Sequence, residues 1–269
     1  MKAAYCQFKP VFGNVAENLR IIERLVRNVE ADLIVLPELC NTGYWFASRR
    51  DAEALGEAFP GGKTTESLSR IAGAKGTHLV AGFIERDGDR LYNAAVLAGP
   101  AGPIAVYRKV HLFSEETLLF DPGDREPAVH DIGFCRLGIM ICFDWLFPET
   151  ARTLALKGAE VLAHPANLVL PYCQDAMVTR CLENRIFAVT ANRIGADVRD
   201  GRELRFTGKS QITAPDGTIL RRAAETAEEV GVVEIDPSLA RNKAINPFND
   251  ALQSRRPEFY GELCRPKRP

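Results

Sequence analysis

Apolar residues follow two patterns along the chain: short continuous runs, and longer segments in which they recur every three or four positions. The runs at 2–8 and 33–36 are too short for helices and are typical of buried strands. Between them, Asn14 and Glu17 have the spacing of a helix start, and apolar residues then recur at helical spacing as far as Val29. This order of strand, helix and strand predicts that the two strands pair in parallel.

The middle of the chain is expected to contribute antiparallel strands. A helix is predicted at 65–74, and three apolar runs separated by glycine-containing turns follow it, at 78–85, 91–98 and 104–108. The next stretch, 111–128, has no regular pattern and is expected to be mostly irregular.

The second half of the chain repeats this mixture. Strands are expected at 129–134, 135–141, 161–163, 187–191, 211–214, 218–221 and 231–235. Helices are expected at 148–157 and 174–184, and the charged segment 197–203 is expected to be a loop. Because no internal linker interrupts these elements, we predict a single α/β domain, 1–269, in two halves that each contain strands and a pair of helices. Periodicity leaves open whether the halves stack sheet against sheet.

Composition and charge exclude several classes of protein. The chain has 269 residues, of which 46% are hydrophobic and 26% charged, as in a globular protein with a full core. The net charge is −1 and basic residues are scattered, which argues against a nucleic-acid partner. No apolar run approaches the roughly 20 residues of a membrane span, and residues 1–10 lack a signal-peptide core. We therefore expect a cytoplasmic protein without a membrane partner.

The seven cysteines form an odd set, without CxxC spacing and without a nearby pair of histidines. This pattern argues against both a disulfide framework and a zinc site, and it favours reduced thiols in a cytosolic protein. No metal and no organic cofactor is implied.

Three polar residues stand where apolar runs end: Glu38, Lys109 and Cys142. Strand ends are where ligands meet the backbone in many α/β proteins. Charged side chains are seldom buried unless they are paired. The charges of a carboxylate, an ammonium and a thiol at neighbouring strand ends would therefore compensate one another. A carboxylate in apolar surroundings has a raised pKa and can take the thiol proton, while the ammonium favours the thiolate and offers a donor to an oxyanion.

Each of these residues also has a structural explanation. Glu38 would serve as a helix or loop cap, Lys109 as a solvated lysine on an edge strand, and Cys142 as a core thiol, since free cysteine is among the most buried residue types. A Cys-His pair using His111 or His164 is the competing catalytic arrangement, although packing or hydrogen bonding is the favoured role for both histidines.

Three sequence blocks resemble the signature blocks of the nitrilase superfamily, the carbon-nitrogen hydrolases. They are Leu-Pro-Glu-Leu-Cys-Asn-Thr-Gly-Tyr at 36–44, Tyr-Arg-Lys-Val-His-Leu-Phe at 107–113 and Gly-Ile-Met-Ile-Cys-Phe-Asp-Trp-Leu-Phe-Pro-Glu at 138–149. Their order and spacing match too, and the resemblance covers nearly the whole chain. The chain looks closest to the short branch of the family, which is typified by a small nitrilase from a hyperthermophilic archaeon.

The resemblance implies an α/β fold, specifically an αββα sandwich in which two sheets are flanked by helices. It also implies a homodimer or higher homo-oligomer, in which helices near 148–157 and 174–184 pair two subunits into an αββα-αββα core. The C-terminal segment, about 237–269, would extend across the partner.

The resemblance also assigns roles to individual residues. Cys142 matches the family nucleophile, Glu38 the general base, Lys109 the third member of the triad, and Glu116 a second carboxylate beside the lysine. The residues expected to bind substrate are Tyr44, Phe143, Trp145 and Asn167.

The implied reaction is cofactor-free hydrolysis of a small aliphatic amide to a carboxylic acid and ammonia, through a thioester on Cys142. The sequence Cys142-Phe143-Asp144 favours amidases and carbamoylases, because the longer nitrile-specific enzymes tend to carry tryptophan and glutamate after the cysteine. The short branch carries the same Cys-Phe-Asp pattern, however. A nitrilase acting on a small nitrile or dinitrile, and an N-carbamoyl amidohydrolase, therefore remain alternatives.

A different class of function is a non-catalytic member of the family that docks partners. The intact set of Glu38, Lys109, Glu116 and Cys142 argues against it, since a docking module has no use for these groups together. We expect a depressed Cys142 pKa, which would let an alkylating reagent label this one thiol selectively among the seven. Uniform slow labelling would favour the docking module.

Overall fold

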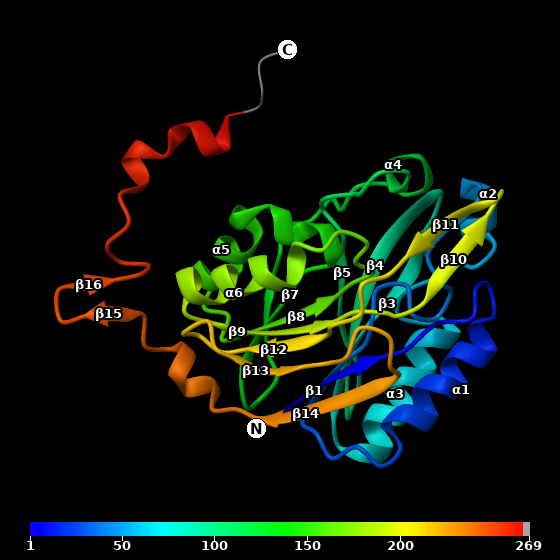
Figure 1. Ribbon diagram of the computed structural model, residues 1–269, viewed down its shortest axis with the longest axis horizontal. Coiled ribbons are helices and arrows are strands. Elements are labelled where there is room, and N and C mark those ends of the chain that lie inside the picture. The colour runs from blue at the N-terminus through cyan, green and yellow to red at the C-terminus, as the bar shows by residue number, and fades with distance from the viewer. Residues whose placement is uncertain (266–269) are drawn as a thin grey trace.

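Two six-stranded sheets pack face to face in the computed structural model, which describes residues 1–265, and helices cover the outer face of each sheet (Figure 1). This is the expected αββα arrangement. The first sheet has the order β14 (Glu229–Glu234), β1 (Lys2–Gln7), β2 (Leu33–Val35), β3 (His78–Asp87), β4 (Arg90–Gly99) and β5 (Gly102–Arg108). The parallel pairing of β1 with β2 and the antiparallel pairing of β3, β4 and β5 confirm the sequence predictions.

The second sheet is also mixed. Its order is β13 (Ile219–Arg222), β12 (Gln211–Thr213), β9 (Phe187–Ala191), β8 (Val161–Pro165), β7 (Arg136–Ile139) and β6 (Val129–Asp131). Here β7, β8 and β9 are parallel, and the outer strands are antiparallel to their neighbours. Both sheets therefore keep their parallel strands at the centre.

Four helices form the outer layers: α1 (Val15–Val26), α3 (Lys63–Lys75), α5 (Pro148–Leu156) and α6 (Cys173–Asn184). The Asn14 side chain accepts a hydrogen bond from the Glu17 backbone at 3.1 Å, which confirms the predicted start of α1. The apolar pattern runs on to Val29, but the helix ends at Val26. Both α1 and α3 lie against the first sheet, whereas α5 and α6 lie against the second (Figure 1).

Two segments expected to be irregular contain regular structure. The charged loop at 197–203 is a hairpin of β10 (Ala196–Arg199) and β11 (Arg202–Arg205). Its turn, Asp200-Gly201, has positive φ at both residues. An Asp-Gly pair is a sequence signal for a two-residue hairpin turn, but the many charged residues of the segment led to the expectation of a loop. A short helix, α4 (Glu116–Leu119), interrupts 111–128, and another, α2 (Arg49–Glu53), was not expected from the sequence.

Side chains of the central strands point alternately to the two faces of the sheet, and this explains why the sequences of these strands are apolar at every position. In β1, Ala3 and Tyr5 face the second sheet, while Ala4 and Cys6 face the helices, and all four are fully buried. Successive side chains of a strand point to opposite faces, so a strand covered on both faces needs apolar residues at every position.

Strand direction places the ends of β2 and β5 at one edge of the first sheet. β2 is parallel to β3, β3 is antiparallel to β4, and β4 is antiparallel to β5. β5 therefore runs in the same direction as β2. Glu38 follows β2 and Lys109 follows β5, so both lie at this edge, and Cys142 follows β7 of the facing sheet.

The loop after β2 lies directly against β3 because residue 82 has no side chain. Cys40 donates a backbone hydrogen bond to Gly82, and Gly82 donates one to Pro37, both at 3.1 Å. A Cβ on Gly82 would lie 2.4 Å from the Glu38 Cα, which is too close for any side chain. Glycine at this position therefore fixes the backbone that carries Glu38.

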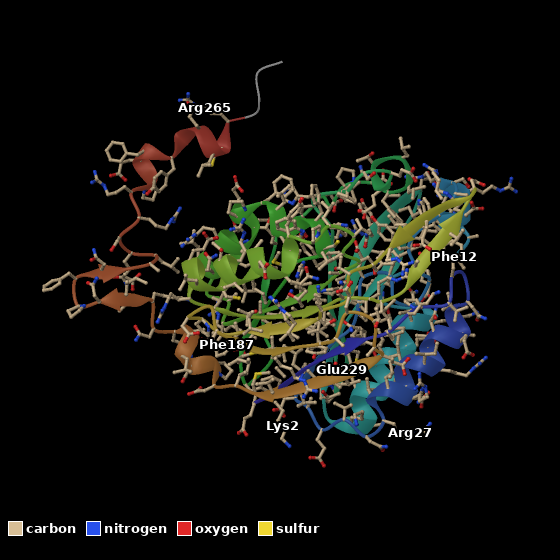
Figure 2. The ribbon with its side chains drawn as sticks, in the orientation of Figure 1. Lys2, Phe12, Arg27, Phe187, Glu229 and Arg265 are labelled. Atoms are coloured by element: carbon tan, nitrogen blue, oxygen red, sulfur yellow. The ribbon has the colours of Figure 1, made fainter. Side chains whose placement is uncertain are left out.

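The C-terminal segment leaves the two sheets after β14 and extends away from them (Figures 1 and 2). It contains η2 (Pro237–Ala240), β15 (Ala244–Asn246), β16 (Asn249–Asp250), η3 (Pro257–Phe259) and η4 (Gly261–Cys264). The Lys243 ammonium ties its start to the end of α6 by donating to the Asn184 and Arg185 carbonyls at 3.0 and 2.9 Å. Beyond this point large apolar side chains are exposed, for example Phe248 at 90%.

Within residues 1–265, none of the helices combines the length and the apolar character needed to span a bilayer.

Candidate active site

A buried ammonium between two carboxylates forms the centre of the site. The Lys109 Nζ donates to Glu38 Oε1 at 2.6 Å and to both oxygens of Glu116 at 2.8 Å. All three side chains are at most 2% exposed. The structure therefore brings together three of the four residues that the sequence placed in the catalytic set.

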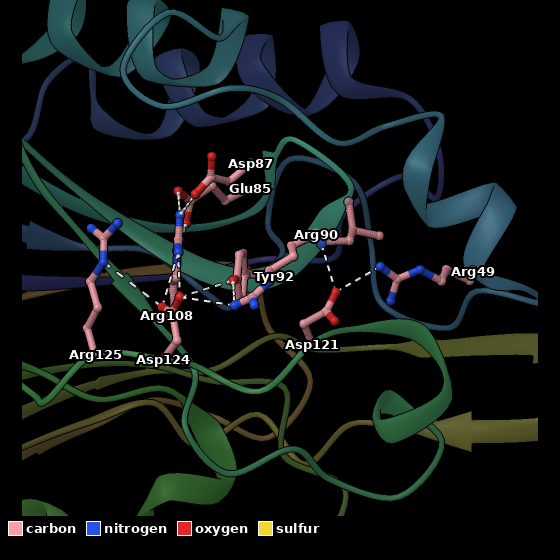
Figure 3. A network of polar contacts seen from close by, with 10 residues as sticks. Arg49, Glu85, Asp87, Arg90, Tyr92, Arg108, Asp121, Asp124 and Arg125 are labelled. Carbon is pink, nitrogen blue, oxygen red and sulfur yellow. Dashed lines mark hydrogen bonds and ion pairs between the residues drawn. The ribbon is translucent and has the colours of Figure 1, made fainter.

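The strand before Lys109 is held by a network on the opposite face of the sheet (Figure 3). Arg108 is buried there and donates to both oxygens of Glu85, at 2.8 and 2.7 Å, and to Asp124 at 3.1 Å. Asp124 belongs to the segment that follows α4, and Gly123 of the same segment donates a backbone hydrogen bond to Lys109 at 2.8 Å. This network fastens the segment after α4 to β5, and α4 begins with Glu116.

The two oxygens of Glu38 have different surroundings. Oε1 accepts from Lys109 and also from the Asn93 side chain at 2.7 Å, whereas Oε2 is buried and has no hydrogen-bond partner in residues 1–265. Burial raises the pKa of Glu38, and the Glu116 charge raises it further against the opposing effect of Lys109. One oxygen of Glu38 is thus held in place while the other is free to exchange a proton.

The positive charge of Lys109 is maintained by its neighbours. Burial by itself would lower the pKa of this lysine, but the charges of Glu116 and Glu38 raise it above its usual value. Glu116 is held in turn by the Tyr44 hydroxyl, which donates to it at 2.6 Å, and by the Phe113 backbone N–H at 3.2 Å. Lys109 therefore remains an ammonium throughout the physiological pH range.

Cys142 begins a short 3-10 helix, η1 (Cys142–Leu146), immediately after the extended end of β7. Its φ of +41° lies in the left-handed region, which a side chain other than glycine occupies at a cost of about 1–3 kcal/mol. Phe143 comes next, and the first N–H groups of such a helix have no carbonyl partner inside the helix. The turn therefore presents, at the same place, the thiol and a backbone N–H that has no acceptor within residues 1–265.

Asp144 holds this turn to the strand that carries the lysine. Its carboxylate is fully buried and accepts hydrogen bonds from the Ile141 N–H at 2.8 Å and the Tyr107 hydroxyl at 2.8 Å. The other oxygen accepts from the His111 backbone at 3.2 Å and lies 2.7 Å from its Nδ1. Tyr107 and His111 flank Lys109 in the sequence, so one carboxylate aligns the two segments that supply ammonium and thiol.

The expected depressed pKa of Cys142 is wrong. Burial raises the pKa of this thiol well above its ordinary value, and the Glu38 charge raises it further, while Lys109 lowers it only in part. The expectation took the nearby ammonium into account, but not the extent of burial or the effect of the second carboxylate, Glu116, which also raises the pKa of the thiol. At neutral pH the resting thiol is protonated, so its reactivity depends on a base.

Neither histidine of the competing arrangement is hydrogen-bonded to the sulfur. The His111 ring stacks on Phe147 at 3.7 Å between centroids and binds Asp144. His164 Nε2 lies 3.0 Å from the Cys142 carbonyl oxygen, and its Nδ1 lies 3.1 Å from the Thr190 hydroxyl. Burial lowers the pKa of His164 to about 4, so its ring is neutral at pH 7. Both histidines have the hydrogen-bonding role that the sequence favoured.

Three of the four residues expected to bind substrate surround the thiol. Phe143, Trp145 and Asn167 line a cavity of about 20 Å³ beside Cys142. The Asn167 side chain also donates to the Glu38 carbonyl at 2.9 Å. Tyr44 lies instead on a neighbouring cavity of about 290 Å³, where its hydroxyl binds Glu116. Within residues 1–265, no cluster of His, Cys, Asp and Glu side chains is grouped as metal ligands would be.

Two residues of this site were not singled out from the sequence. Asn93 orients Glu38, and its signal was a lone amide inside the apolar run at 91–98, since a buried amide must find a partner. Tyr107 orients Asp144 and lies in one of the signature blocks, where a buried phenol likewise implies a partner for its hydroxyl. In both cases the sequence showed that a partner was needed but did not show which one.

The neutral state of His164 predicts a specific loss of stability in acid. Its folded pKa of about 4 is below the unfolded value of 6.5, so the unfolded state alone takes up a proton between these pH values. This contribution to stability is complete above pH 6.5 and is lost as pH falls to 4, a change of about 3 kcal/mol. Guanidinium unfolding at pH 7 and pH 4 should show wild type losing about 3 kcal/mol more than His164→Gln. Equal losses would contradict a neutral His164.

Comparison with known proteins agrees with this geometry. Residues 2–244 match the family model for carbon-nitrogen hydrolases. A nitrilase from Pyrococcus abyssi is 49% identical over 97% of this chain and 99% of its own length, and an (R)-stereoselective amidase from Pseudomonas is 37% identical over 97% and 94%. A cysteine-to-alanine mutant of the Nesterenkonia AN1 amidase superposes with a TM-score of 0.81 at 26% identity, covering 98% of this chain and 97% of that one. The chain therefore belongs to the carbon-nitrogen hydrolase family of the nitrilase superfamily and is a hydrolase acting on carbon-nitrogen bonds.

Proposed function

We propose that the protein hydrolyses a small aliphatic amide to a carboxylic acid and ammonia through a thioester on Cys142. The observation that supports this most strongly is the asymmetry of Glu38, whose Oε1 is fixed by two donors while Oε2 has no partner in residues 1–265. A general base needs an oriented carboxylate with one oxygen free to accept a proton. The Glu38 side chain meets this requirement beside a buried thiol.

The first step transfers the thiol proton to Glu38 as the sulfur attacks the amide carbon. Both groups are buried, and burial raises the pKa of each, so the thiol stays protonated until substrate arrives and the carboxylate is basic enough to take its proton. The S–C bond forms, the carbonyl electrons move onto oxygen, and Glu38 becomes neutral. Lys109 remains an ammonium beside the developing negative charge.

The oxyanion of this intermediate is stabilised by two donors. One is the Lys109 ammonium, and the other is the Phe143 N–H at the start of η1. Because both donors are fixed before the substrate binds, they need no rearrangement as the charge develops.

Breakdown of the intermediate reverses the role of Glu38. Its proton passes to the leaving nitrogen, the C–N bond breaks, and ammonia departs from a thioester on Cys142. Water then attacks the thioester and Glu38 accepts the water proton. As the S–C bond breaks, Glu38 returns this proton to the departing sulfur, which gives the acid, the thiol and the resting carboxylate. The same carboxylate thus acts alternately as base and acid in both halves of the reaction, which suits a group whose pKa is raised.

Three relatives define the alternative substrates. The Pyrococcus abyssi relative is named a nitrilase, and relatives from tomato and potato, each 29% identical, are named N-carbamoylputrescine amidases. In nitrile hydrolysis the thiolate would add to the nitrile carbon and the proton would move to its nitrogen, and the same groups would serve. We favour the amide because the Pseudomonas relative and the Nesterenkonia structures are named amidases.

We also propose that two copies of the chain pair through α5 and α6, with the segment from 237 onward reaching across the partner. Leu156 on α5 is 48% exposed and Leu182 on α6 is 46% exposed, and Phe248 of the C-terminal segment is 90% exposed. Exposed apolar residues gathered on packed elements mark protein interfaces. Residues 266–269 of that segment lie outside the described residues.

The catalytic proposal predicts ammonia release from propionamide, and less from an N-carbamoyl amino acid and a short dinitrile. Cys142→Ala should lower turnover by about 10⁴-fold or more, because no other group replaces the nucleophile. Cys135→Ala is the matched control, since Cys135 is also a buried free thiol but precedes β7. Release from the dinitrile with little from propionamide would identify a nitrilase. Equal turnover in Cys142→Ala would overturn the scheme.

The contacts of Asp144 predict that Asp144→Asn lowers kcat about 100-fold while changing KM by less than threefold. An amide has one acceptor oxygen, so it cannot accept from Tyr107 and the Ile141 N–H on one side and from the His111 N–H on the other, as the two carboxylate oxygens do, and displacements of about 1 Å cost about this much in rate. The control is Asp131→Asn, at the distant β6–β7 turn, which should retain activity. Unchanged kcat in Asp144→Asn would show that the thiol is aligned without this carboxylate.

The pairing proposal predicts sedimentation of the full chain at about twice its mass of 29.7 kDa. Leu156→Glu should shift the chain to the monomer, because it places a charge in the proposed interface. Leu118→Glu is the matched control, since Leu118 is 75% exposed on α4, which lies apart from α5 and α6 in Figure 1. A wild-type monomer at all micromolar concentrations would contradict pairing.

A further inference from the structure

Phe113 lies between two cavities of very different size. The cavity beside Cys142 has a volume of about 20 Å³, and Phe113 is part of its wall. The second cavity, of about 290 Å³, is bounded by Phe113, Tyr44, Trp45 and Leu204. Among the residues described as lining either cavity, Phe113 is the one shared by both.

The position of Phe113 is fixed by its neighbours. Its ring packs edge-on against Phe143, the residue after the nucleophile, with 5.0 Å between centroids. Its backbone N–H donates to Glu116 at 3.2 Å. The following residue, Ser114, has a φ of +51°, a conformation that turns the chain away directly after Phe113. The aromatic ring is therefore held at the boundary between the two cavities by both backbone and side-chain contacts.

The small cavity cannot accommodate a substrate with an appreciable acyl substituent. A volume of about 20 Å³ is close to that needed for one water molecule. An amide group that reaches Cys142 must therefore leave the rest of its acyl chain elsewhere. The larger cavity adjoins the small one at Phe113 and has apolar walls from Tyr44, Trp45 and Leu204.

The polar rim of the larger cavity is largely neutralised by internal pairs. Glu115 is held by Arg199 at 2.7 Å and by the Trp45 indole at 3.2 Å, and Arg202 lies 3.9 Å from its other oxygen. Glu203 is paired with Arg205 at 2.6 Å. Pairs of this kind leave the apolar walls as the main surface offered to a ligand. An unbranched aliphatic chain is the chemical class that such walls favour.

We propose that Phe113 limits the length of the acyl chain that the protein accepts, and that the larger cavity behind its ring is the space into which a longer chain would extend. In wild type the ring confines productive binding to short acyl groups. Removal of the ring joins the two cavities, so a longer chain enters the larger one. This inference rests on the proposed amide hydrolysis, which it deepens.

The test compares kcat/KM for propionamide and hexanamide. In Phe113→Ala the hexanamide to propionamide ratio should rise at least tenfold over wild type, since one methylene in an apolar pocket changes the rate about 10-fold or more. Phe113→Leu should give an intermediate ratio and covers the case in which the alanine variant does not fold. The matched control is Phe134→Ala, a partly buried phenylalanine at the β6–β7 turn that packs on His78. Its ratio should equal that of wild type.

A second variant identifies the cavity that receives the chain. Leu204 lines the larger cavity and does not line the small one, so Leu204→Trp reduces the larger volume without changing the surroundings of Cys142. Added to Phe113→Ala, it should return the hexanamide to propionamide ratio to within threefold of wild type. If the double variant keeps the tenfold gain, the chain lies outside the larger cavity and the proposal is overturned.

Thiol labelling separates this inference from the proposed function. Cys142 is labelled with iodoacetamide and with the bulkier N-phenylmaleimide, and each rate is followed by mass spectrometry of the Cys142 peptide. Phe113→Ala should raise the ratio of bulky to small labelling at least fivefold, whether or not any amide is hydrolysed. A raised ratio without turnover of any amide would refute the proposed function and retain the two-cavity arrangement. Unchanged ratios in both assays would overturn the role of Phe113.

Discussion

The arrangement of this site depends on the buried ion pair of Lys109 with Glu38 and Glu116. An isolated ammonium would not remain charged at this depth, since desolvation alone lowers its pKa. Two carboxylates within 2.8 Å reverse that shift, and they in turn need Asn93 and Tyr44 to satisfy their oxygens. Each partner is itself buried by the sheet or by α4. The ion pair therefore exists only when the strands, the loop after β2 and α4 are all in place.

The thiol is coupled to this ion pair by position and by charge. Asp144 fastens the turn that begins at Cys142 to residues on both sides of Lys109, and His164 holds the carbonyl of the cysteine itself. The same burial that makes these contacts strong raises the pKa of the thiol. A permanently ionised thiolate is thereby excluded, so a reaction at this sulfur requires a base, the role that we propose for Glu38. Catalysis in such a site follows from alignment of a neutral thiol with a basic carboxylate.

The sites of contact between the segments are also where the backbone is most constrained. Cys142 has a positive φ, and the loop that carries Glu38 can pack directly against Gly82 because this residue has no Cβ. Arg108 holds the segment after α4 through Asp124, on the face of the sheet opposite to Lys109. These features lie outside the reacting groups, yet they determine where those groups stand. In the proposed mechanism four side chains supply the chemistry, and the residues that anchor the four segments supply their geometry.

The sequence by itself determined the order and type of most strands and helices, because apolar periodicity reflects which faces are buried. It also singled out Glu38, Lys109 and Cys142 as candidates, since each stands at the end of an apolar run, and Glu116 through its resemblance to the family. The charged β10–β11 hairpin was missed because its strands bury no apolar face. Only the tertiary structure decided the direction of the Cys142 pKa, the partners of Asn93 and Asp144, and the boundary at Phe113. All of these depend on which segments meet across two sheets, and local sequence carries no record of distances between segments far apart in the chain.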